Sequence, residues 1–367
     1  MKQGDARGYA EVFSQRSDQR AALQEATALG ALPVESIDLT LARGQDVRWS
    51  GDKAKAAVKM RIVFRGLAKG NVFETFAIWE LERAGAAGLR IASIEEGGIP
   101  GFWKQGYSGW RTSPNFAVAF KPGGGGAKEA NEVLAEAERS LARLKASGIP
   151  AVGPYLIVIA ESKNEFGMMV RADARDAPGA TSGLPTTAAG GDKALLNHAF
   201  YLNRDALKKY VKRGKSYLRE NLIAHEIFHL CMMPYDSPAT PWWVREGVAV
   251  FLSNEFTESN AEFLAMTSGE NKAMQLAMLT IKSADDRYNE SKGGYIDVEH
   301  YLYAKLAIAA LADRFGMPKV IEFYKAAGEA KSASGAAAIA RANQLCKKHF
   351  GITMGEIDQM VAARTRP

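Results

Sequence analysis

The stretch "NLIAHEIFHLCMMPYDSPATPWWVREGVAVF", residues 221–251, carries two histidines four positions apart, a glutamate beside the first, and another glutamate 17 positions after the second. Positions four apart on an α-helix lie one turn above each other, so His225 and His229 can reach a single ion. Glu226 is rotated by about 100° from His225, close enough to contact a water at that ion but poorly placed to bind it. Two ligands with a separate general base are the chemistry of the H-E-x-x-H motif, so the stretch predicts a site for one Zn²⁺ ion.

A catalytic zinc site needs a third protein ligand and leaves its fourth position to water. The best candidate is Glu246, in "PWWVREGVAVF". The turn-forming residues "MPYDSPATP", 233–241, end the first helix, and "WWVREGVAVFL" has the character of a second helix. A helix–turn–helix of this length can bring Glu246 beneath the histidine pair, and Gly247 would let the helices approach closely because it has no side chain. The alternative is a pair of core histidines that hydrogen-bond within an amphipathic helix.

Composition sets outer limits on the protein. A chain of 367 residues, 47% hydrophobic and 24% charged, is typical of a globular protein with about two domains. No apolar run approaches the ~18 residues of a membrane-spanning helix. The basic run "KKYVKRGK", 208–215, comes without aromatic stacking residues or a finger motif, so we expect a solvated helix face and no nucleic-acid partner. Cys231 and Cys346 are too few for a disulfide framework and are expected to be buried thiols.

The N-terminal part predicts a small accessory domain, residues 1–103. A polar and Ala-rich helix is expected over 9–30, ending at Gly30. Period-two alternation then predicts an antiparallel meander with one buried face, over residues 36–43, 54–66, 71–83 and 89–96. A helix on such a sheet is similar in general pattern to nuclear-transport-factor-2-like and cystatin-like folds. The Gly-, Pro- and Trp-rich residues 95–114 are expected to be a connector.

The remainder, residues 104–367, predicts a second domain and makes the fold class α+β. We expect strands at 116–120, 155–160 and 198–203, a helix at 127–147, a loop over 161–193, and helices after Asp205. This order corresponds to a mixed-sheet subdomain, a zinc helix and a helical C-terminal subdomain. His198, at the start of the third strand, is expected at the surface.

The segments "AHEIFHL" and "PWWVREGVAVF" resemble the gluzincin metallopeptidases, in particular the bacterial peptidase-MA-like domains, in which P-x-W-x-x-E-G-x-A follows H-E-x-x-H. The resemblance covers roughly residues 110–367. It implies zinc ligation by His225, His229 and Glu246, with Glu226 as general base. It also implies that the strand at 198–203 is the sheet edge along which an extended peptide pairs. Many relatives are secreted or membrane-tethered, so an extracytoplasmic location is expected, reached through a leader that this chain does not carry; a cytoplasmic one stays open.

The family commonly uses a tyrosine to stabilise the oxyanion of the transition state. Tyr303, in "EHYLYAKLA", is the first choice, and Tyr301 and His300 are its rivals. The resemblance thus implies a zinc-dependent peptidase acting on peptide or protein substrates. The segment "LLNHAFYLNRDALKKY" has no G-x-M-E-N stretch of the aminopeptidase type, which favours an endopeptidase.

The competing hypothesis is a catalytically silent, peptidase-like module that keeps the fold for binding or as a scaffold. Glu226 argues against it, because a purely structural zinc site has no use for a general base. Closed structural sites also usually have four protein ligands, and only three candidates are found here.

Overall fold

The computed structural model describes residues 11–12, 16–42, 47–68, 71–85, 88–97, 101–170, 177–187, 193–211, 217–255, 275–281, 298–330 and 334–365. Contacts divide the chain into two compact units. Unit 1 comprises Met1–Glu138 and Val152–Gly214, and unit 2 comprises Arg139–Ala151 and Lys215–Pro367. None of the described helices is long and apolar enough to cross a membrane.

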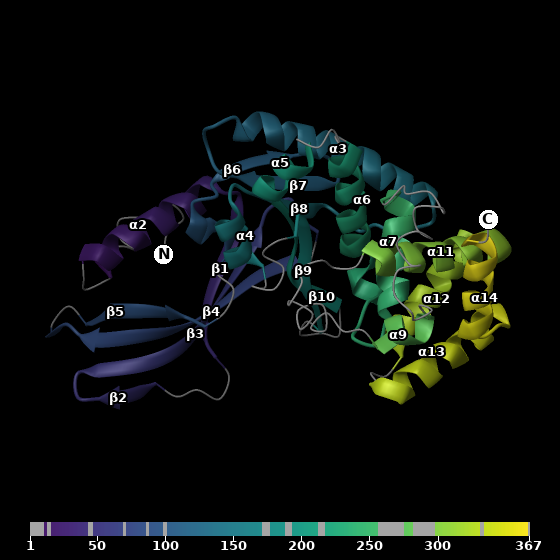
Figure 1. The fold of residues 1–367 in the computed structure, drawn as a ribbon. Coiled ribbons are helices and arrows are strands. Elements are labelled where there is room, and N and C mark those ends of the chain that lie inside the picture. The colour runs from purple at the N-terminus through teal and green to yellow at the C-terminus, as the bar shows by residue number, and fades with distance from the viewer. Residues whose placement is uncertain are drawn as a thin grey trace. The chain divides into compact units, whose positions relative to one another are not determined.

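Unit 1 begins with the predicted helix and meander (Figure 1). Helix α2 is followed by strands that pair antiparallel in the order β1–β3–β4–β5, with the short β2 beside β3. The predicted helix and strands are found within a few residues of their expected bounds, apart from the beginning of the helix, which lies outside the described residues. The elements are α2 (Arg16–Ala31), β1 (Val34–Leu41), β2 (Arg48–Ser50), β3 (Lys53–Phe64), β4 (Asn71–Arg83) and β5 (Leu89–Glu96).

The sheet does not stop at the meander. Its order is β1-β3-β4-β10-β8-β7-β6, with parallel pairing of β10 to β4, of β10 to β8 and of β7 to β8. The expected mixed sheet is therefore present. The further elements are η2 (Phe102–Gln105), β6 (Gly109–Thr112), β7 (Phe116–Phe120), α3 (Gly126–Ala146), β8 (Tyr155–Ala160), α4 (Lys163–Met169), β9 (Gly179–Thr187), β10 (Lys193–Asn203) and α5 (Arg204–Val211).

The join between β4 and β10 is short but reinforced. Only two residue pairs form it, Leu195 with Asn71 and Leu196 with Val72. The side chain of Asn197, a residue with φ of 53°, then accepts a hydrogen bond from the backbone N–H of Glu74 at 2.8 Å and donates one to its carbonyl at 3.0 Å. An asparagine side chain thus extends the ladder where the backbone of β10 turns away, because Asn tolerates positive φ better than most residues.

Residues 95–114, expected to be a connector, contribute to the main core of unit 1. Phe102, Trp103 and Tyr107 are at most 1% exposed. The rings of Phe102 and Trp103 lie 5.5 and 6.0 Å from that of Phe64, in a cluster that also contains Phe73. A Gly- and Pro-rich composition concealed these buried aromatic residues. The expected boundary after residue 103 lies within this core, and the compact units divide the chain elsewhere.

The strand at 198–203 is not a sheet edge. It is the second half of β10, which has β8 on one side and β9 as an antiparallel partner. Since β9 pairs only with β10 among the described strands, β9 is one of the strands at the edges of the sheet. The expected loop at 161–193 contains both β9 and the helix α4, because "GATSGLPTT" has no hydrophobic period that would predict a strand. His198 is accordingly only 1% exposed, and the expectation of a surface histidine is wrong.

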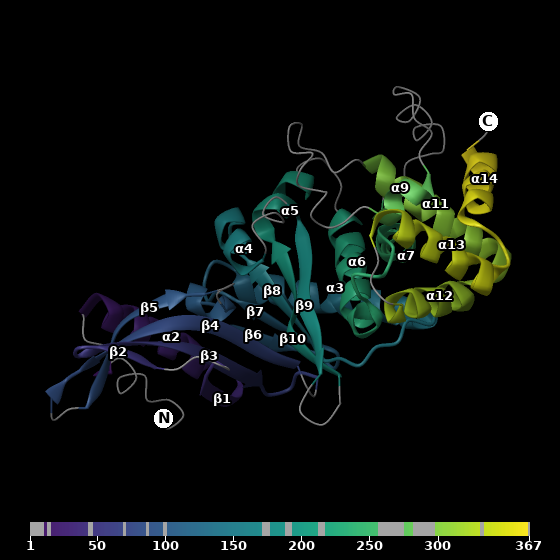
Figure 2. The ribbon, with the colours of Figure 1, turned by 90° about the horizontal axis from the view of Figure 1, so that it is seen from below.

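Unit 2 is helical, as expected for the residues after Asp205 (Figure 2). Gly247 of α7 lies where an added Cβ would come within 2.8 Å of the carbonyl oxygen of Ala304. The glycine therefore permits the close approach of α7 to α11, a different helix from the one expected. The helices are α6 (Tyr217–Met232), η4 (Met233–Tyr235), α7 (Trp242–Ser253), α9 (Leu276–Ile281), α11 (Val298–Phe315), α12 (Met317–Glu329), α13 (Gly335–Phe350) and α14 (Met354–Thr365).

Candidate metal centre

Helix α6 places polar side chains in an apolar interior. Ile223, Ala224, Ile227 and Phe228 are at most 1% exposed, so the helix is buried on more than one face. His225 and Glu226 lie among them, each 7% exposed, and Glu246 on α7 is 4% exposed. Burying such groups is costly unless each has a partner, so their presence here calls for a compensating interaction.

The three predicted ligands come together. Nε2 of His225 and Nε2 of His229 are 3.0 Å apart, and Oε2 of Glu246 lies 3.3 Å from the first and 3.5 Å from the second. Zinc bonds to nitrogen and oxygen are about 2.0–2.1 Å long, which puts neighbouring ligand atoms of a tetrahedral site about 3.3–3.4 Å apart. The observed separations of 3.0–3.5 Å are close to this spacing, so the three atoms are positioned as ligands of one small ion would be.

The electrostatics of this group favour positive charge. Burial opposes protonation of His225, but the carboxylates of Glu255 and Glu246 outweigh burial and raise the pKa of this imidazole well above its ordinary value. Two imidazole nitrogens and one carboxylate oxygen are a donor set that zinc accepts readily, and three protein ligands leave a fourth position for a water or a substrate. The residues therefore fit a catalytic type of zinc site.

Glu255 is a site residue that sequence reasoning missed. Its Oε2 lies 2.6 Å from Nδ1 of His225, although the two groups are not aligned as a well-formed hydrogen bond. A carboxylate on the second nitrogen of a metal-binding histidine fixes the ring orientation and strengthens the ligand. A carboxylate this close favours the tautomer of His225 with its proton on Nδ1, which would leave the lone pair of Nε2 for an ion.

The connection between α6 and α7 is held by an internal ion pair. The guanidinium of Arg245, next to Glu246, lies 2.8 Å (Nε) from Oδ2 of Asp236 and donates from Nη2 to Oδ1 of Asp236 at 3.1 Å and to the Ser237 carbonyl at 2.8 Å. Burial opposes the charge on Arg245, but the nearby Asp236 carboxylate raises its pKa. Two-pronged pairing of this kind fixes direction as well as distance. It anchors the first turn of α7, directly before Glu246.

The three candidates for the oxyanion donor all lie on α11, but their side chains have different neighbours. The ring of Tyr301 lies 6.5 Å from that of His225 and 5.0 Å from that of Trp242. His300 contacts Trp242 at 6.4 Å. The hydroxyl of Tyr303 instead donates to Oδ1 of Asp358 on α14 at 2.7 Å. The structure thus brings the Tyr301 ring beside a predicted zinc ligand and directs the Tyr303 hydroxyl to Asp358.

Neither cysteine belongs to the metal group. Cys231, two positions after His229, is 1% exposed, and Cys346 is fully buried; neither forms a disulfide. Their expected role as small buried residues agrees with this environment.

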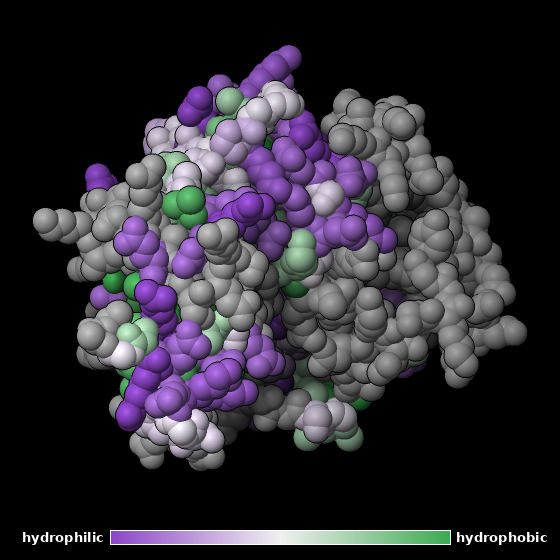
Figure 3. All heavy atoms as spheres, turned by 90° about the vertical axis from the view of Figure 1, so that its left-hand side faces the viewer, coloured by the Kyte–Doolittle hydropathy of each residue, from purple (hydrophilic) through white to green (hydrophobic). Residues whose placement is uncertain are grey.

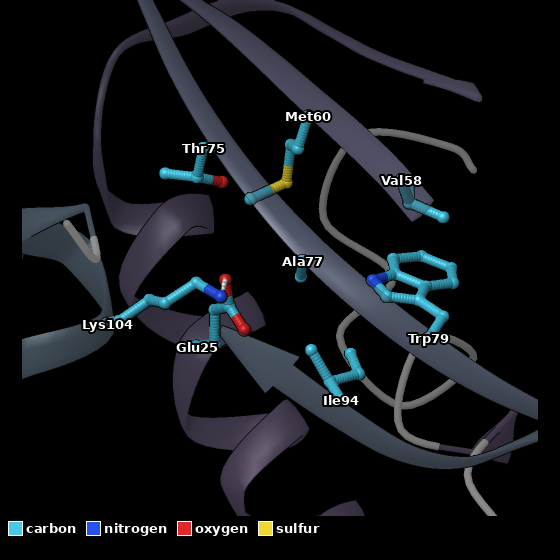
Figure 4. Close-up of a pocket in the computed structure, with 8 residues that line it drawn as sticks. All are labelled: Glu25, Val58, Met60, Thr75, Ala77, Trp79, Ile94 and Lys104. Carbon is cyan, nitrogen blue, oxygen red and sulfur yellow. Dashed lines mark ion pairs between the residues drawn. The ribbon is translucent and has the colours of Figure 1, made fainter. Parts of the chain in front are cut away.

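A cavity in unit 1 is too small for a substrate. Figure 4 shows Glu25 and Lys104 pointing toward each other above the sheet, with Met60 and Trp79 among the residues around them. Its volume of about 10 Å³ is room for roughly one water molecule. On the side of the molecule drawn in Figure 3, hydrophilic residues cover most of the coloured surface, and the hydrophobic residues seen there occur in small groups.

No protein-family model matches the sequence, and no curated protein matches it. Among solved structures, the chain is similar to an M1 zinc metallopeptidase from Deinococcus radiodurans, a mutant crystallised with a Tyr-Ser-Ala substrate. The similarity has a TM-score of 0.36 and 15% sequence identity over 86% of this chain. The chain spans 62% of the length of that structure.

Proposed function

We propose that the protein is a zinc-dependent peptidase whose metal ligands are His225, His229 and Glu246. The observation that supports this most is the convergence of these three donor atoms at separations of 3.0–3.5 Å inside a buried helix pair. Without a metal, the two Nε2 atoms are close enough to share a hydrogen bond, and the same three atoms have nearly the separations that ligands of one zinc ion need.

Glu226 serves as general base in this proposal. It follows His225 on the same buried helix and is 7% exposed, so its carboxylate can accept a proton without competition from bulk water. Zinc, when bound, lowers the pKa of a coordinated water and polarises the substrate carbonyl. Glu226 accepts the proton of the attacking water and then passes it to the leaving amine.

Tyr301 is the proposed oxyanion donor, in place of Tyr303. The Tyr303 hydroxyl is committed to Asp358 at 2.7 Å, whereas the Tyr301 ring lies beside His225. Two positions along an α-helix differ by about 200°, so the two tyrosines of α11 cannot serve the same centre. A phenol donates to developing negative charge without changing its own charge, as oxyanion stabilisation requires.

The proposed substrate is an extended peptide or protein segment. Internal cleavage is favoured over removal of single N-terminal residues, because the G-x-M-E-N stretch that would hold a substrate amino terminus is missing before the zinc helix. An extracytoplasmic location stays part of the proposal.

The test is hydrolysis of casein and of a quenched-peptide library by the zinc-loaded protein, with and without chelator. Glu226→Gln should keep stoichiometric zinc and lose turnover by about 10²–10⁴-fold. Glu220→Gln is the matched control, because Glu220 lies on the same helix but pairs with Arg139 and Arg143 at its exposed side. Its turnover should be unchanged. A zinc-loaded protein that cleaves nothing in the library would contradict the proposal and support a silent binding module.

A further inference from the structure

The segment that carries Glu255 lies just beyond the end of α7 and is not held by helical hydrogen bonding alone. Helix α7 ends at Ser253, and the residue that follows it, Asn254, has the left-handed φ of 57°. The backbone N–H of Glu255 donates to Oγ of Ser253 at 3.3 Å. The carbonyl of Asn254 accepts from Nδ2 of Asn221 on α6 at 3.1 Å, so the zinc helix itself holds one side of this turn.

Lys305 on α11 holds the other side of the turn. Its Nζ donates to the backbone carbonyl of Glu255 at 2.7 Å, the short distance typical of a hydrogen bond from a charged donor. The side chain of the same Glu255 lies 2.6 Å from Nδ1 of His225. One short chain of contacts therefore runs from Lys305 through Glu255 to a predicted zinc ligand.

Lys305 also lies one helical turn after Tyr301. Residues four apart on an α-helix share a face, so the face of α11 that presents Tyr301 to the His225 ring also presents Lys305 to Glu255. The two residues place α11 against the metal centre at two points. A shift of α11 would move the Tyr301 ring and the Glu255 carboxylate together.

We propose that Lys305 is a positioning residue of the metal centre: it fixes the Glu255 backbone so that its carboxylate orients His225 for zinc, and it ties that carboxylate to the helix carrying Tyr301. The inference rests on the proposed zinc site but not on peptide hydrolysis. Lys305 acts on the metal centre through Glu255, unlike a lysine that only stabilises the fold.

The experiment is a double-mutant cycle on zinc affinity, measured by competition with a chromogenic chelator on the full chain. Lys305→Met and Glu255→Gln should each weaken zinc binding by about 10–100-fold, the usual effect of losing a partner behind a metal ligand. The double variant should be no weaker than the worse single variant, because both changes break the same chain of contacts. Lys305→Arg, which keeps a charged donor, should restore affinity to within about twofold of the wild type.

Two further measurements exclude a general loss of structure. Lys325→Met is the matched control, because Lys325 is also in unit 2 but lies over the Tyr235 ring, at 4.7 Å. It should leave zinc affinity unchanged. The visible absorption of the Co²⁺-substituted protein should change in Lys305→Met and not in Lys325→Met, because the ligand geometry changes only in the first. If Lys305→Met fails to fold, Lys305→Gln, an uncharged donor, takes its place in the cycle.

Unchanged zinc affinity in Lys305→Met, or effects of Lys305→Met and Glu255→Gln that simply add, would overturn the inference. Suppose that the wild-type protein binds zinc tightly and cleaves no peptide, while the variants give the expected double-mutant cycle. That result would refute only the proposed function. If the wild-type protein cleaves peptides but Lys305→Met binds zinc as tightly as the wild type, only the role of Lys305 is refuted.

Discussion

Two clusters of buried polar groups in unit 2 have opposite designs. In the metal cluster, defined as His225, His229, Glu246 and Glu255, two imidazole nitrogens and one carboxylate oxygen converge at 3.0–3.5 Å. In the Asp358 cluster, the Tyr303 hydroxyl and the backbone N–H of Leu276 both donate to Oδ1 of Asp358, at 2.7 and 3.1 Å. Donors meet an acceptor there, and the contacts join α9, α11 and α14.

The difference shows how a binding site can be told from a structural contact when both are buried. In the Asp358 cluster, two donors from the chain itself face the half-buried carboxylate and offset part of the cost of its burial. The metal cluster is complete only with added positive charge. Removing a residue should therefore affect ion binding in the first case and folding stability in the second.

The largest expected effect is loss of the ion. His229→Ala or Glu246→Ala should weaken zinc binding by more than the ~10–100-fold typical of residues behind the ligands, because a direct ligand is removed. Asp358→Asn, the same kind of change in the other cluster, should leave zinc affinity as it is. Chelator competition measures both, and equal zinc affinities in Glu246→Ala and Asp358→Asn would erase the distinction between the clusters.

The two tyrosines of α11 provide the next contrast. Tyr301→Phe should lower kcat by about 10²–10³-fold with zinc retained, because a donor to the oxyanion is lost. Tyr303→Phe should leave kcat unchanged and lower the free energy of unfolding by about 1 kcal/mol, the worth of one hydrogen bond. Steady-state kinetics and urea unfolding of both variants test this. The reverse pattern would restore Tyr303 to the catalytic role expected from sequence.

The space around two glycines, Gly247 and Gly355, shows how tightly the helices near each cluster are packed. An added Cβ at Gly247 would lie 2.8 Å from the Ala304 carbonyl oxygen, whereas at Gly355 on α14 the nearest atom is 3.9 Å away. Gly247→Ala should destabilise the protein by about 1–3 kcal/mol through overpacking. Gly355→Ala should be neutral or stabilising by up to about 1 kcal/mol, since alanine is the better helix former. Equal midpoints in urea would show that α7 and α11 are not in close contact.

The smallest effect concerns the two thiols, one near each cluster. Burial, with the Asp358 carboxylate nearby, raises the pKa of Cys346 to about 12, and Cys231 is 1% exposed. A buried thiol that stays protonated is a poor nucleophile. Neither cysteine should react with a disulfide reagent at pH 8 until the protein is unfolded. Fast labelling of Cys231 in the folded protein would mean that the interior face of α6 is accessible.

The local part of the site could be predicted from sequence because helical geometry is local. The spacing of His225 and His229 sets their common face, and the turn signals at 233–241 predict the return that brings up Glu246. Glu255 could not be found in this way. Its position depends on the left-handed turn at Asn254 and on contacts from two other helices, and no spacing rule covers these.

The choice between Tyr301 and Tyr303 shows the same limit. Both lie on one predicted helix, and only the packing of α11 determines which of them lies beside His225. In the sheet, the uniformly apolar strands β7 and β8 were predicted with their bounds, while β9 was missed because its residues carry no period. The composition of the Gly-rich segment that contains Phe102 and Trp103 also does not predict that these residues are buried.

X-ray absorption of the zinc-loaded protein tests the central claim most directly. The account predicts one zinc per chain, surrounded by two imidazole nitrogens and by carboxylate and water oxygens at about 2.0–2.2 Å. In His229→Ala, part of the imidazole scattering should be lost. A sulfur shell at about 2.3 Å, or substoichiometric zinc that Glu246→Ala leaves unchanged, would contradict it.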